Sequence, residues 1–151
     1  MASKTVHSSL ERIRFESGAP GPPEARPLEA AAMCSLLVGD ALYLGNTAGR
    51  IQRWRSSPTL APDTWLTPPI TRGAYTGAVS DLVPAPGGGL LSLHDAPCEL
   101  VVWDAKDRIR YRIDLRDRIP RDNPARAVHL SPDGRYVLVQ AEHKLLLVPL
   151  R

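Results

Sequence analysis

The stretch ALYLGNTAGRIQRWR, residues 41–55, joins an apolar run to a second run, rich in apolar and basic residues, through a small polar turn. Alternation with a period of two is typical of a β-strand, because successive side chains point to opposite faces of a sheet. The turn NTAG has the composition of a tight connection between antiparallel strands. The stretch therefore predicts a β-hairpin in which Trp54 points to the face opposite Ile51.

The same arrangement occurs twice more along the chain. VSDLVPAPGGGLLSLHDAPCELVVWD covers residues 79–104, and AVHLSPDGRYVLVQAEHKLLLVPLR covers residues 127–151. Aligning the third strands places Trp54, Trp103 and Val148 in equivalent positions. A repeat of this length, with four short strands in each unit, is typical of β-propeller blades. We predict an all-β fold whose blades have four antiparallel strands, with three blades per chain.

Outer strands complete the first two units but not the third. RIRYRIDLR at 108–116 is the expected outer strand of the second unit, and TWLTPPI at 64–70 that of the first. RIRF at 12–15 nearly repeats RIRY at 108–111, which predicts a displaced outer strand at 10–15. The expected organisation is a flexible N-terminus at 1–9 and a partial propeller at 10–151, with residues 17–30 as a Pro-rich linker.

These units resemble the blades of the WD-repeat family. LYLGNTAGRIQRWR and LLSLHDAPCELVVWD are similar to the second and third strands of such blades, and LSPDGRYVLV is similar to a turn between their first two strands. The sequence also departs from the family pattern, because only the second unit has the Trp-Asp pair, at Trp103-Asp104. No Gly-His dipeptide introduces a unit, so the family's Asp-His-Ser-Trp hydrogen-bond relay is not expected.

The repeat number predicts association between chains. Propeller rings have four to eight blades, so three blades would expose the apolar flanks of the end blades. We predict a homodimer with six blades, in which Arg12, Ile13 and Phe15 pair with the 144–150 strand of a neighbouring copy. Three copies, or a different chain that supplies the other blades, are the alternatives.

The composition indicates a cytoplasmic protein. The net charge of +3 comes from scattered arginines, and even RDRIPRDNPAR at 116–126 is interrupted by aspartates, which makes nucleic acid an unlikely partner. No membrane span is expected. Cys34 and Cys98 have neither disulfide-framework nor zinc-site spacing, and no cofactor or metal is predicted.

The side chains favour a protein–protein interaction module over an enzyme. HDAPC at 94–98 has ligand and nucleophile types, but one turn offers few groups with fixed geometry. The alternatives are a subunit of a heteromeric complex and a propeller hydrolase or lyase, in which His94, His129 and Asp81 would converge at the channel mouth. The residues predicted to contact a partner protein are Asn46, Arg50, Arg72, Tyr75, His94 and Arg121.

Overall fold

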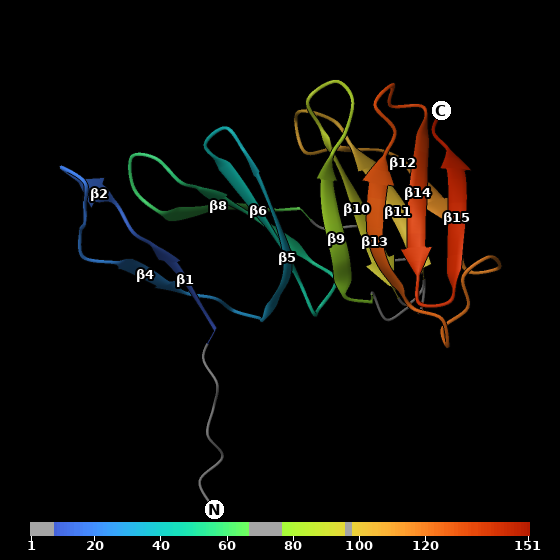
Figure 1. Cartoon of the computed structure of the whole chain (residues 1–151), viewed down its shortest axis with the longest axis horizontal. Helices are drawn as coiled ribbons and strands as arrows, with labels where there is room; N and C mark the ends of the chain where they lie inside the picture. The colour runs from blue at the N-terminus through green and yellow to red at the C-terminus, as the bar shows by residue number, and fades with distance from the viewer. Residues whose placement is uncertain (1–7, 67–76, 96–97) are drawn as a thin grey trace, which may run out of the picture.

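The computed structural model describes residues 8–66, 77–95 and 98–151, and in these ranges the chain is all-β. Three antiparallel sheets follow one another along the sequence (Figure 1). Sheet 1 contains β5 (Ala32–Val38), β6 (Ala41–Asn46), β7 (Ile51–Arg55) and β8 (Ala61–Leu66) in that order. Sheet 2 contains β9 (Val79–Pro84), β10 (Leu90–Asp95), β11 (Cys98–Trp103) and β12 (Ile109–Asp114). Sheet 3 contains β13 (Ala125–Leu130), β14 (Tyr136–Ala141) and β15 (Lys144–Pro149).

The segment before sheet 1 differs from the predicted strand and linker. β1 (Ser9–Arg12) pairs with β4 (Glu24–Pro27), and beyond them β2 (Phe15–Glu16) pairs with β3 (Ala19–Pro20). Residues 10–15 thus do not form one continuous strand, and residues 17–30 include strands as well as loop. We call residues 8–28 the arm. Residues 1–7, most of the predicted flexible N-terminus, lie outside the described ranges.

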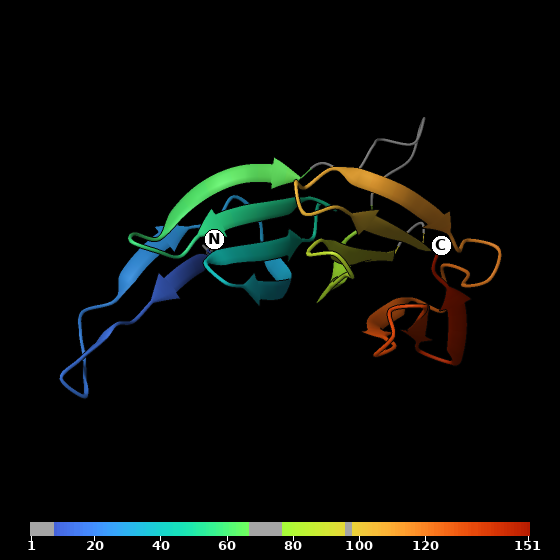
Figure 2. The same ribbon diagram turned by 90° about the horizontal axis from the view of Figure 1, so that it is seen from above.

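The sheets form an arc that does not close. β5 contacts β9, and β9 contacts β13, so the first strands of the three sheets are neighbours. They lie on the concave side of the arc, and β8 and β12 lie on its convex side (Figure 2). The arm stands at one end of the arc, and β15 stands at the other.

Apolar side chains between the sheets form the core. One cluster joins sheets 1 and 2 and contains Ile51, Val79 and Trp103; a larger one joins sheets 2 and 3. β10 has neighbours on both of its faces, which explains why its residues from Leu90 to His94 are all buried. Gly45 allows close approach of sheets 1 and 2, because a Cβ there would lie 2.6 Å from Cγ1 of Val79 on β9.

One backbone hydrogen bond recurs in every sheet. The N–H groups of Thr47, Asp95 and Glu142, which follow or end the second strands, donate to the carbonyls of Ala31, Ala78 and Pro124 respectively. The three sequence repeats are therefore also repeats in space. No helix in the described ranges is long and apolar enough to cross a membrane.

Candidate interaction surface

The residues predicted to contact a partner lie in different environments. Asn46 is buried, and its Oδ1 accepts hydrogen bonds from the N–H groups of Ala48 (3.0 Å) and Arg50 (2.9 Å). Asn46 therefore shapes the turn between β6 and β7. The guanidinium of Arg50 lies 4.1 Å from the ring centroid of Trp65, which is a cation–π contact within sheet 1.

The other predicted contacts do not join that turn. His94 is buried in sheet 2, and Arg121 is exposed in the connection between β12 and β13. Arg72 and Tyr75 lie outside the described residues. The structure thus brings Asn46 and Arg50 together and leaves His94 without the exposure that a partner contact requires.

His94 belongs to a relay that the sequence did not predict. Trp103 Nε1 donates to Ser92 Oγ at 2.9 Å, and Ser92 Oγ lies 3.1 Å from His94 Nε2. Burial lowers the pKa of His94 to about 4, although a hydrogen bond with the Gly77 backbone acts in the opposite direction. His94 lies on β10 itself and not in a Gly-His dipeptide before the sheet, so the family pattern does not indicate this relay.

The nearby thiol is also enclosed. Cys98 is buried, and burial raises its pKa to about 12, so the nucleophilic thiolate is scarce at neutral pH. Cys34 and Cys98 are both free thiols. Among the residues that the structure describes, no group of three His, Cys, Asp or Glu side chains is placed to hold a metal ion.

The end of the arc at β15 has the features of an interaction surface. Among the described strands, β15 pairs only with β14, so its outer edge carries unpaired backbone groups. Leu145 and Leu147 are 65% and 62% exposed. They alternate with Leu146 and Val148, which pack in the cluster between sheets 2 and 3, so Leu145 and Leu147 share the face of sheet 3 that points away from sheet 2. An exposed apolar edge strand is a typical site of strand pairing with another chain.

A cleft lies beside this edge. It has a volume of about 410 Å³ and lies between the end of β15 and β12, the outer strand of sheet 2. Tyr111 and Ile113 line it on the β12 side, and Val148 and Pro149 line it on the β15 side. The space beside β15 is therefore partly apolar and open.

The arm covers the opposite end of the arc. Leu10 and Leu28 pack against a buried cluster that includes Leu44 and Trp54 of sheet 1. Arg12 donates to the carbonyl of Ser56 and forms an ion pair with Glu24. Arg26 Nε donates to the carbonyl of Leu60 at 3.1 Å. Arg12, expected from the sequence to pair with a neighbouring copy, thus binds its own chain, whereas Ile13 and Phe15 are exposed.

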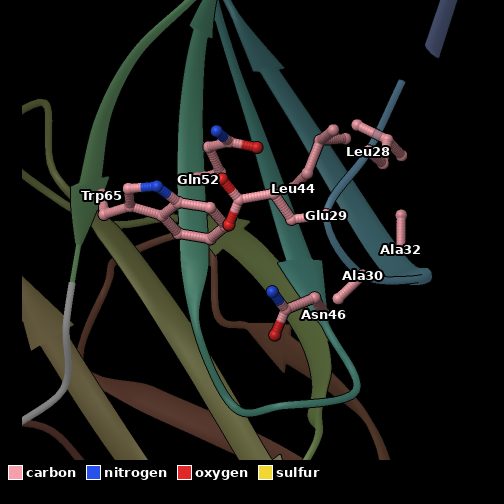
Figure 3. A pocket seen from close by; sticks show the side chains of 8 residues that line it. All are labelled: Leu28, Glu29, Ala30, Ala32, Leu44, Asn46, Gln52 and Trp65. Atoms are coloured by element: carbon pink, nitrogen blue, oxygen red, sulfur yellow. The ribbon is translucent and has the colours of Figure 1, made fainter. Parts of the chain in front are cut away.

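A second pocket lies where the arm meets sheet 1 (Figure 3). Its lining includes Leu28 and Glu29 from the arm side and Leu44, Gln52 and Trp65 from sheet 1. Its cavity volume of about 10 Å³ leaves space for about one water molecule. This pocket is a packing gap beneath the arm rather than a ligand site.

The contact between the arm and sheet 1 resembles the contacts between successive sheets. Trp103 packs with Leu66 of β8, and Val148 belongs to the cluster that Tyr111 of β12 contacts. Trp54, their equivalent in sheet 1, packs with Leu10 of the arm. The arm therefore covers sheet 1 much as the outer strand of a preceding sheet would.

Asp81 connects sheets 2 and 3, and removing its carboxylate tests that connection. Its Oδ2 accepts a hydrogen bond from the Val128 N–H at 2.9 Å, and its Oδ1 accepts one from the Leu82 N–H at 2.9 Å. We expect Asp81→Ala to lower the free energy of unfolding by about 2 kcal/mol, because it leaves a partly buried donor unpaired. Urea unfolding followed by circular dichroism measures this change. Asp81→Asn keeps an acceptor and should cost less; equal losses would contradict this explanation.

The comparisons with known proteins add no family. The sequence matches no protein-family model and no curated protein. The resemblance to WD-repeat blades consequently rests on the quoted motifs and on the all-β, four-stranded sheets.

Proposed function

We propose that this chain is a non-catalytic protein–protein interaction module, built from three successive blades of an incomplete β-propeller, that associates with a second copy of itself through β15. Two observations support the propeller interpretation: the sheets are ordered along an arc, and their first strands are neighbours on its concave side (Figure 2). The equivalent positions of Trp54, Trp103 and Val148 support it further, because each faces the element that precedes its own sheet.

The observation that carries the proposal is the contrast between the two ends of the arc. The arm covers Trp54 at one end, whereas β15 at the other end has a free edge and exposed leucines. A repeat array needs a cap at each end to keep its apolar surface from water. A second copy that pairs with the uncapped end covers its apolar surface. Two copies related by a two-fold axis then have no uncapped end left, so no further copy adds.

Ring closure remains a different arrangement of the same two copies. In that arrangement sheet 3 of one copy would pack on sheet 1 of the other, at the surface that Leu10 and Leu28 cover here. The arm would first have to leave sheet 1 and break its contacts with Ser56 and Leu60. Association through the uncovered end requires no such loss, which is why we favour it.

Sedimentation velocity over a wide range of protein concentration tests the proposal. We expect a reversible dimer with twice the 16.5 kDa mass of the chain. The double variant Leu145→Lys, Leu147→Lys should be a folded monomer, because it places charge on the proposed contact. Leu145→Met, Leu147→Met keeps the apolar surface and should remain dimeric.

Two results would contradict this function. A chain that stays monomeric at every concentration would instead fit a subunit of a heteromeric complex. A dimer that the lysine substitutions leave unchanged would show that the contact lies elsewhere on the molecule. Far-ultraviolet circular dichroism of each variant verifies that its strands are intact.

A further inference from the structure

We infer that two copies associate by pairing β15 with β15 of the second copy, antiparallel and centred on Leu146, so that their two three-stranded sheets become one continuous sheet. This inference rests on the proposed function and specifies its contact. Its basis is the phase of the backbone groups along β15, the placement of the exposed leucines and the open space beside the strand.

The backbone groups that β15 directs outward can be identified from one hydrogen bond. The Leu150 N–H donates to the Arg135 carbonyl at 2.7 Å, one position beyond the pair formed by Tyr136 and Pro149. Residues of an antiparallel pair alternate between bonding to the partner strand and facing away from it. Leu145 and Leu147 therefore direct both N–H and C=O to the free edge.

This pattern is its own complement under a two-fold rotation. With Leu146 opposite its copy, Leu145 lies opposite Leu147 of the second chain, and each of these pairs can exchange both backbone hydrogen bonds. The same register brings the exposed leucines of both chains together on one face. Acidic side chains are absent from β15, and the basic residue Lys144 lies at its end, so like charges are separated in the pair.

The surroundings of β15 leave room for this pairing. The cleft of about 410 Å³ separates β12 from the end of β15. Its β12 side combines the apolar side chains of Tyr111 and Ile113 with the charged residues Arg112 and Asp114. Pro149 lacks an N–H group, so the ladder ends there and stays short.

The arm is less suited to this edge. The Leu28 N–H donates to the Ser8 carbonyl at 2.9 Å, so by the same alternation Ser9 and Glu11 direct their backbone groups outward. Leu10, not these residues, faces sheet 1. In sheet 2, Leu115 directly follows the outer strand β12; its N–H donates to the Cys98 carbonyl of the third strand, and its side chain packs toward sheet 3. In the arm, by contrast, the residues with free backbone groups are not the ones whose side chains face the core. The arm therefore lacks the alternation expected of a fourth strand of sheet 3.

A cysteine at the two-fold axis tests the register. Residues opposite each other in a non-hydrogen-bonded antiparallel pair have Cα atoms about 4.5 Å apart, which is within the range of a disulfide. Leu146→Cys should therefore form a covalent dimer under mild oxidation. Lys144→Cys is the matched control: its copies would be separated by four residues along the strand, about 13 Å, and should not bridge.

The readout is the fraction of disulfide-linked dimer on a non-reducing gel. The unmodified chain is run alongside to measure any bridging by its own free thiols, of which Cys34 is partly buried and Cys98 is buried. We expect bridging by Leu146→Cys to exceed bridging by Lys144→Cys about tenfold or more. Equal bridging of the two variants, or a dimer that persists without any bridge at 146, overturns this register and leaves the proposed function standing. A chain that never dimerises overturns both.

Discussion

Gly89→Ala is expected to prevent the chain from folding stably. A Cβ at position 89 would overlap the carbonyl oxygen of Trp103 and lie 2.8 Å from its carbonyl carbon. Both atoms belong to the backbone of β11, so no side-chain rotation relieves the overlap. The strands can separate only by breaking the ladder that pairs Leu90 with Trp103.

The expected loss in unfolding free energy is more than about 4 kcal/mol, which is a large part of the stability of a small domain. Circular dichroism and the urea midpoint of the purified variant measure it. Gly39→Ala is the control, because Gly39 has a φ of +57° and an added methyl group would meet no other atom within 4 Å. It carries only the left-handed backbone cost of about 1 kcal/mol. A Gly89 variant as stable as the Gly39 variant would contradict the close approach.

The hairpin of sheet 1 shows what the sequence predicts well. The alternation after Gly49 and the apolar run before Asn46 correspond to β7 and β6 as the structure has them. Strand periodicity is a local property, because it depends on which side chains share a face of the sheet. The sequence also identifies the turn residue Asn46, but its side chain bonds the turn instead of being offered to a partner.

The arm shows where local patterns are insufficient. Its prolines indicate a loop, yet Glu24–Pro27 forms a strand because β1 supplies hydrogen bonds and sheet 1 supplies apolar contacts. Pro27 is tolerated at the end of that two-stranded ladder, where its missing N–H costs little. The expected outer strand of sheet 1 at 64–70 overlaps β8 only over residues 64–66, and residues 67–70 lie outside the described ranges.

The buried relay could not be predicted from the sequence for a related reason. Ser92 and His94 are two positions apart on β10, which places them on one face of the sheet. That Ser92 meets both Trp103 and His94 depends on the register of β10 against β11 and on sheet 1 covering this face. His94 thereby becomes an internal hydrogen-bonding group, whereas its position before a turn indicates an exposed one.

Acid is expected to destabilise the fold through His94. Burial lowers the pKa of His94 from an ordinary value of 6.5 to about 4. Below pH 6.5 the unfolded chain therefore takes up a proton that the folded chain excludes until about pH 4. The stability contributed by neutral His94 is complete above pH 6.5 and is lost as the pH falls through this window. A pKa difference of this size corresponds to a loss of about 3 kcal/mol in unfolding free energy.

The relay explains why the neutral form is held. The Trp103 Nε1–H donates to Ser92 Oγ, and in the tautomer whose Nε2 carries no proton the Ser92 hydroxyl donates to His94 Nε2. A proton on Nε2 would oppose the hydroxyl hydrogen and place a charge in a buried site.

Urea unfolding between about pH 4 and pH 7 measures the effect. His94→Gln should be less stable at neutral pH but should lose most of the slope, because it has no titrating group, whereas the exposed His143→Gln should keep it. A slope that survives in His94→Gln would assign the acid sensitivity to the carboxylates instead.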